Sequence, residues 1–182
     1  GILSLDYKEK YIFDGMYRMD GSSLFGEDER WNAYYRVSGA WRLSEEFTIP
    51  GVQELKLRGA YGISGQRPGF SYQYEVMGLS RGSASKSTLG NTELKPSRSI
   101  ETEVGLNAQF LNIFDFEVIY ANVVTEDQFL QAPQAVQYGG WQYRWLNAGT
   151  LESNALEMTL GAQLAQKTDF KLHTSLIYDQ YR

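Results

Sequence analysis

The sequence predicts an all-β protein, an antiparallel up-and-down meander of about eight strands. Three observations support this fold class. Apolar and polar residues alternate over long segments, which is the pattern of a β-strand and not of a helix. Short turns and long loops occupy alternate connections. Finally, no run of 18 apolar residues exists that could form a transmembrane helix.

The predicted strands follow one another along the whole chain. Their approximate ranges are 2–7, 11–20, 31–43, 55–65, 98–111, 114–125, 153–165 and 169–181. The segment Ile100–Leu111 shows the alternation most clearly. One of its faces carries Val104, Leu106, Ala108 and Phe110, and the other carries Glu101, Glu103, Asn107 and Gln109. Such a strand separates an apolar medium from a polar one, either a core from solvent or lipid from a watery lumen.

The connections indicate which of these two settings applies. Short, medium and tight connections lie at Lys8–Lys10, Ser44–Glu54, Asn112–Ile113 and Gln166–Thr168. Long ones lie between them, at Gly21–Arg30, Gln66–Ser97 and Glu126–Glu152. Because a meander places alternate connections at opposite ends of the sheet, one end carries turns and the other carries loops. Membrane barrels have this asymmetry.

The third predicted strand adds a length estimate. Trp31 and Trp41 lie on the same face, ten positions apart. At ~3.3 Å per residue and a tilt of ~45°, the two rings are separated by roughly 23 Å along a membrane normal, close to the ~25 Å apolar band of outer-membrane barrels. The two tryptophans of a sandwich core would give the same sequence pattern, so this strand alone leaves both settings open.

Composition excludes several functions. The formal net charge is −5, and no basic stripe is present, so we expect no nucleic-acid partner. The chain has no cysteine, which excludes disulfides and thiolate metal sites. His173 is the only histidine, and no nucleophile motif accompanies it. We therefore expect neither an enzyme nor a bound cofactor or metal. The acidic run Glu27-Asp28-Glu29 favours a solvated loop over a calcium site.

Aromatic residues in the two longest loops are the candidate substrate-binding residues. The loop that follows residue 126 contains Tyr138, Trp141, Tyr143 and Trp145, and the loop that follows residue 66 contains Phe70, Tyr72 and Tyr74. Exposed aromatic rings offer flat apolar faces to sugar rings or peptide side chains, and Tyr and Trp add a polar group. The alternative is that these rings pack loop against loop and cap the mouth of a barrel.

An ordered set of short motifs resembles the TonB-dependent outer-membrane transporters, and among them the SusC-like nutrient importers. These motifs are Arg18-Met19-Asp20-Gly21-Ser22-Ser23 followed by Phe25-Gly26, Ser38-Gly39-Ala40-Trp41-Arg42-Leu43-Ser44-Glu45-Glu46, Leu55-Lys56-Leu57-Arg58-Gly59-Ala60-Tyr61-Gly62, the stretch 91–106 and the stretch 146–160. Each motif is weak alone, but together they cover nearly the whole chain in the family's order.

The resemblance implies an open, curved segment of a 22-stranded outer-membrane β-barrel. On this interpretation residues 1–182 are part of the C-terminal half of the barrel domain, without the plug domain, a signal peptide or the final strand. The implied location is the outer membrane of a Gram-negative bacterium. The implied partners are outer-membrane lipid, the TonB energy-coupling complex acting through the plug, a SusD-like lid lipoprotein and an oligosaccharide or peptide substrate.

Three other interpretations remain open. An outer-membrane enzyme would need a cluster of catalytic residues, and we find none in the sequence. A complete eight-stranded outer-membrane barrel would have about this strand number. A soluble carbohydrate-binding β-sandwich would account for the aromatic loops.

Overall fold

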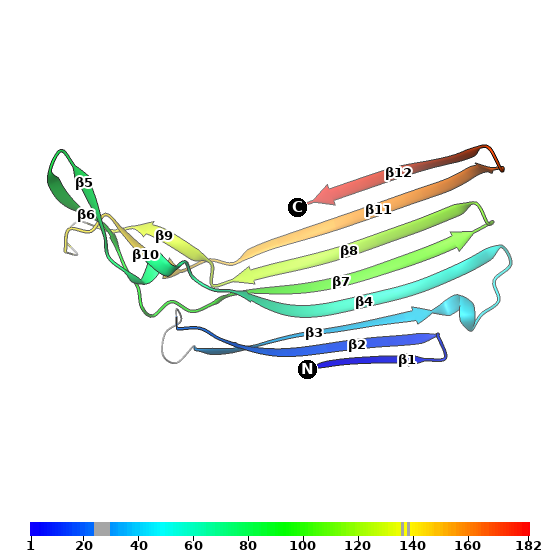
Figure 1. Ribbon diagram of the computed structural model, residues 1–182, viewed down its shortest axis with the longest axis horizontal. Helices are drawn as coiled ribbons and strands as arrows, with labels where there is room; N and C mark the ends of the chain where they lie inside the picture. The colour runs from blue at the N-terminus through cyan, green and yellow to red at the C-terminus, as the bar shows by residue number, and fades with distance from the viewer. Residues whose placement is uncertain (24–29, 136, 138) are drawn as a thin grey trace.

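The main structural element is a single antiparallel sheet of eight strands (Figure 1). The structure is a computed structural model that describes residues 1–23, 30–135, 137 and 139–182. The strands of this sheet, in spatial order, are β1 (Ile2–Tyr7), β2 (Tyr11–Gly21), β3 (Trp31–Arg42), β4 (Val52–Gln66), β7 (Ser97–Phe110), β8 (Phe114–Glu126), β11 (Leu151–Gln166) and β12 (Lys171–Tyr181). Each strand pairs antiparallel with the next long strand in the chain, which confirms the predicted meander.

The sheet is open. β1 and β12 lie on its opposite edges, and the described residues form no ladder between them. A complete eight-stranded barrel requires that ladder, because its strands close into a ring. The structure therefore contradicts the small-barrel interpretation and confirms the open segment.

A second sheet corrects the prediction for the two longest connections. We expected 66–97 and 126–152 to be loops, but they contain β5 (Val76–Ser80), β6 (Ser83–Leu89), β9 (Phe129–Pro133) and β10 (Tyr143–Asn147). The order in this sheet is β5-β6-β10-β9, and β6 and β10 run parallel. We call these four strands the loop sheet. It lies beyond the end of the main sheet and does not stack on its face, so the structure is not a two-layer sandwich (Figure 1).

In the residues that the structure describes, helical structure is limited to two short 3₁₀ segments, η2 (Leu43–Glu45) and η3 (Phe70–Gln73). Within the described part of the chain, no helix has the length and apolar character needed to cross a membrane.

Strand register sorts the side chains of the main sheet onto two faces. Residues that pair across neighbouring strands share a face, because both point to the same side of the pleat. One cross-strand row runs through all eight strands and is apolar or aromatic throughout: Tyr7, Tyr11, Trp41, Leu57, Leu106, Val118, Met158 and Tyr178. We call the side that carries this row the outer face and the opposite side the inner face.

The outer face is uncovered. Val104 and Leu176 on it expose 51% and 71% of their surface, and many other large apolar side chains of this face are also exposed. Among the described residues the buried side chains are few, and the most buried is Leu94, just before β7. A single-layer sheet has no second layer that could form a core, so its apolar face needs an apolar medium.

The turns of the main sheet lie at the end opposite the loop sheet, as the connection pattern predicts (Figure 1). Two of these turns have three residues, and one of the two joins β7 to β8. Leu111 and Asn112 both adopt left-handed backbone angles there, with φ values of 56° and 55°. Asparagine tolerates this conformation, but leucine is strained in it because its Cβ crowds the carbonyl oxygen.

We expect Leu111→Gly to raise the free energy of unfolding by about 1 kcal/mol, since glycine adopts this backbone conformation without a Cβ clash. Guanidinium titration of the full-length protein folded in detergent measures the change. Leu111→Val is the matched control and should destabilise the protein, because a β-branched side chain is still less compatible with positive φ. Equal stability of the three proteins would contradict the assigned turn.

Candidate functional site

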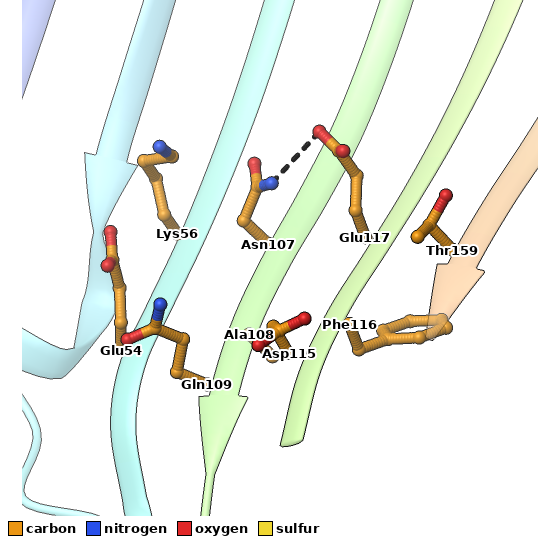
Figure 2. Close-up of a pocket in the computed structure, with 9 residues that line it drawn as sticks. All are labelled: Glu54, Lys56, Asn107, Ala108, Gln109, Asp115, Phe116, Glu117 and Thr159. Carbon is orange, nitrogen blue, oxygen red and sulfur yellow. Dashed lines mark hydrogen bonds between the residues drawn. The ribbon is translucent and has the colours of Figure 1, made fainter. Parts of the chain in front are cut away.

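The inner face carries a polar hollow that two cross-strand rows build. Lys56, Asn107, Glu117 and Thr159 form one row across β4, β7, β8 and β11, and Glu54, Gln109 and Asp115 belong to the next row. These side chains line a hollow of about 270 Å³ (Figure 2). The two rows lie on the same side of the sheet because their members on any one strand are two positions apart, and side chains two positions apart in a strand point the same way.

The hollow mixes both signs of charge with neutral donors and acceptors. The Asn107 Nδ2 group donates a hydrogen bond of 3.0 Å to Glu117 Oε1, as Figure 2 shows. Lys56 supplies an ammonium group, whereas Gln109 and Thr159 supply an amide and a hydroxyl group. Such a surface can hydrogen-bond a polar solute or a neighbouring polar protein segment. The sequence pattern predicted that Asn107 and Gln109 lie on the polar face of their strand, but it did not indicate the hollow.

Next to the hollow, the side chain of one arginine extends over the neighbouring strand and reaches the strand after it. Arg58 of β4 donates to Glu103 Oε1 on β7 at 3.0 Å and to Glu117 Oε1 on β8 at 2.8 Å. Its path passes over Gly105, the residue of β7 that pairs with it. A Cβ atom at position 105 would lie 2.8 Å from Arg58 Nε. Glycine at this position therefore lets the guanidinium group reach the second strand.

We expect Arg58→Met and Gly105→Ala each to lower the free energy of unfolding by about 1–2 kcal/mol, because either change leaves a partly buried carboxylate without its cation. The double variant should lose little more than Arg58→Met alone, since both changes remove one interaction. Guanidinium titration of the full-length protein in detergent gives the three values. Strictly additive losses would show that Gly105 does not serve the Arg58 contact.

Six of the seven candidate aromatic residues lie among the described residues, in or beside the loop sheet, and they differ in exposure. Tyr72 and Trp145 stack with ring centroids 3.6 Å apart and an interplanar angle of 14°. Tyr72 also meets Phe129 edge to face. Trp141 lies before β10 and is only 6% exposed, and Lys86 Nζ sits 5.4 Å from its ring centroid. These three rings pack loop against loop.

Three other candidates remain at the surface. Phe70 and Tyr74 expose 67% and 50% of their surface, and their ring centroids are 5.2 Å apart. Tyr143 on β10 is 39% exposed. Tyr138, the seventh candidate, and the acidic run Glu27-Asp28-Glu29 lie outside the described residues. Extended alternation would place Trp141, Tyr143 and Trp145 on one side, but only the last two belong to the strand.

Asn147 ties the two long connections together at their base. Its Nδ2 group donates to the carbonyl oxygens of Lys95 and Asp127, at 3.0 and 2.8 Å. Its Oδ1 atom accepts a 2.8 Å hydrogen bond from the Lys95 backbone nitrogen. The side chain thus bridges the segment before β7 and the segment after β8. Within the loop sheet, Gln131 Nε2 of β9 donates a 2.8 Å hydrogen bond to the buried hydroxyl group of Thr88 on β6.

We expect Asn147→Ala to loosen the loop sheet without unfolding the main sheet, because it leaves three backbone groups without their partner. Limited proteolysis of the full-length protein should cut within 67–96 or 127–150 several-fold faster, while the protease-resistant core keeps its size. Asn112→Ala, at the other end of the sheet, is the control. An unchanged cleavage rate in Asn147→Ala would mean that other contacts suffice to hold the loops.

Comparison with known families identifies the fold. The family model described as "TonB dependent receptor-like, beta-barrel" matches residues 2–182. The chain belongs to this family. This result confirms the resemblance inferred from the motifs.

Curated TonB-dependent receptors match along nearly the whole chain. TonB-dependent receptor P26 of Formosa agariphila is 27% identical over 97% of this chain and 19% of its own length. TonB-dependent receptor SusC of Bacteroides thetaiotaomicron is 27% identical over 93% of this chain and 19% of its own length. The chain therefore spans about a fifth of these relatives.

A solved structure agrees in fold. The RagAB peptide importer in its closed-closed state superposes with a TM-score of 0.84 at 22% identity, over 100% of this chain and 21% of that chain. The open eight-stranded sheet and its loop sheet therefore correspond to one section of a TonB-dependent receptor barrel.

Proposed function

We propose that this chain is a section of the barrel wall of a nutrient importer in the outer membrane of a Gram-negative bacterium. The observation that carries the proposal is the unbroken apolar row across all eight strands, opposite an inner face with an ion-paired network. Lipid would contact the outer face, and the inner face would line a lumen.

Aromatic residues at two heights of the outer face support this orientation. At the turn end, Tyr11 stacks on both Tyr7 and Trp41. Toward the loop end, Tyr35 and Tyr61 form another pair, and Trp31 stands at the start of β3. Two aromatic girdles mark the two interfaces of an outer-membrane barrel. The loop sheet would then face the cell exterior and the tight turns the periplasm.

The proposed cargo is an oligosaccharide or a peptide. One relative is SusC, and the solved structure with the same fold is a peptide importer. The donors and acceptors of the inner hollow and the exposed rings of Phe70 and Tyr74 suit solutes with both polar groups and flat apolar faces. The mechanism would be capture at the outer mouth followed by gated passage, with no covalent chemistry.

The proposed partners follow from the family resemblance. The plug domain would belong to the rest of a longer protein, and the TonB complex would act through it. A SusD-like lid lipoprotein would sit over the mouth, where the loop sheet is the most prominent part of this section (Figure 1). The Tyr72–Trp145 stack and the Asn147 bridge would give such a lid a firm platform.

We expect the paired change Phe70→Ala, Tyr74→Ala in the full-length importer to weaken ligand binding by roughly 5- to 150-fold. This range assumes two lost ring contacts of about 0.5–1.5 kcal/mol each. Uptake of labelled oligosaccharides and peptides is measured in a deletion strain that carries each variant, with surface abundance quantified in parallel.

Tyr17→Ala is the control, because it removes an exposed ring from the outer face and not from the loops. If the paired variant shows normal uptake and affinity at normal abundance, Phe70 and Tyr74 do not belong to the proposed binding site. The importer function itself is tested by comparing the deletion strain with the same strain carrying the intact gene. We expect the deletion strain to lose uptake of the labelled substrates and the intact gene to restore it. No difference between the deletion and intact strains for any substrate would overturn that function.

A further inference from the structure

A second hollow on the inner face lies between an arginine and a glutamate. Strand register places Arg36 of β3, Gly62 of β4 and Glu101 of β7 in one cross-strand row. These three residues help to line a hollow of about 350 Å³, which we call the Arg36 hollow. Ser64 and Ser99, which pair with each other in the next row, add two hydroxyl groups to its lining. All three strands lie in the interior of the main sheet, with a neighbour on each side.

A glycine forms the floor of the Arg36 hollow between the two charged residues. A Cβ atom at Gly62 would lie 3.5 Å from Arg36 Cγ, which is an ordinary van der Waals contact. Gly62 is also not among the glycines with positive φ. A larger residue would therefore fit the strand, and β-branched residues are favoured in strands. Neither the backbone nor the neighbouring atoms require glycine here, so its effect is to leave the floor open.

The Arg58 network shows what the same spacing allows when the charges meet. Arg58 extends over Gly105 and makes ion pairs of 3.0 Å with Glu103 and 2.8 Å with Glu117, which is two strands away. Arg36 and Glu101 are also two strands apart with a glycine between them. Within the described part of the chain, however, neither of their side chains makes an ion pair or a hydrogen bond. The hollow lies between two opposite charges that have not closed on each other.

The Arg36 hollow lies on the loop side of the Arg58 network. Gly62 is four positions beyond Arg58 in β4, in the direction of the loop sheet. At ~3.3 Å per residue this separation is about 13 Å along the strand. In the orientation proposed above, the loop end faces the cell exterior, so this hollow is on the side from which cargo would enter the lumen.

The width of the hollow suits a ligand with a charge at each end. Neighbouring strands are ~4.8 Å apart, so the backbones of Arg36 and Glu101 are separated by roughly 10 Å. An extended tripeptide spans about 10 Å. Its α-carboxylate can accept two parallel hydrogen bonds from a guanidinium group, and its α-ammonium group can donate to a carboxylate. A neutral sugar of similar length has no charge to offer to either residue.

We propose that the Arg36 hollow is a subsite for a short peptide with free ends. Arg36 would bind the α-carboxylate and Glu101 the α-ammonium group, while the peptide backbone would lie over Gly62. The hydroxyl groups of Ser64 and Ser99 would hydrogen-bond the peptide groups. The inference rests on the proposed importer function, and it narrows the cargo recognised at this position from oligosaccharides or peptides to peptides.

The test measures binding of trialanine to the full-length protein in detergent. Isothermal titration calorimetry compares this tripeptide with its N-acetylated form, its C-terminal amide and the trisaccharide maltotriose. We expect the intact protein to bind trialanine roughly ten-fold or more tightly than each of the other three, which corresponds to about 1.4 kcal/mol for one charge-assisted contact.

Two variants assign the ends of the peptide. Arg36→Gln should bind trialanine and its amide about equally but still prefer trialanine to the acetylated form. Glu101→Gln should show the opposite pattern. Gly62→Val should weaken trialanine binding roughly ten-fold without lowering the melting temperature, because it fills the floor of the hollow. Lys171→Gln, at the turn end of β12, is the control and should leave all affinities unchanged.

The outcomes separate the subsite from the importer function. If the intact protein does not prefer free ends, or if both variants keep its preferences, the subsite is wrong, and uptake in the deletion strain still decides the importer function. If Arg36→Gln and Glu101→Gln lower the melting temperature of the unliganded protein and change no preference, the two residues pair with another segment of the longer protein, which also overturns the subsite. A preference lost at the matching end in each variant supports it.

Discussion

The ladder of backbone hydrogen bonds in a single-layer sheet is the constraint on which the rest of this structure depends. With no second layer, each interior strand must satisfy its N–H and C=O groups through its two neighbours. The register is thereby fixed along each pair, from β1–β2 to β11–β12, apart from one-residue shifts between Val52 and Glu54 in β4 and between Gln163 and Ala165 in β11. Fixed register in turn decides which side chains share a row. The apolar row, the polar hollow and the Arg58 network all result from that one geometric fact.

Much of this arrangement follows from the sequence because the alternation of side chains is local. The segment that begins at Glu101 predicted its own two faces, and the pairing of Leu106 with Leu57 and Val118 extends the apolar face to both neighbours. The spacing of the connections predicted which end carries the turns. Strand ends were less precise, since β4 begins at Val52 and β11 at Leu151, slightly before their predicted starts.

The loop sheet could not be predicted in the same way. Its strands are short, and its central ladder joins β6 to β10, which are more than fifty positions apart and parallel. The turn at Arg81-Gly82, where both residues have positive φ, is a local hairpin signal, but no local signal indicates the β6–β10 pairing. The stack of Tyr72 on Trp145 depends on that same pairing. Sequence reasoning therefore found the aromatic residues without knowing which rings would be covered.

The bridge between the two long connections has a consequence for how such a barrel can diverge. Surface loops ordinarily accept insertions one at a time, since each loop is anchored only at its own ends. Here a residue added within β6 would shift its register against β10, and the side chains of β6 beyond the added residue would change sides. Insertions should therefore be tolerated at the Arg81-Gly82 tip but be rare within the paired segments. The tip of the loop sheet can therefore vary in length, while its paired strands keep the same arrangement.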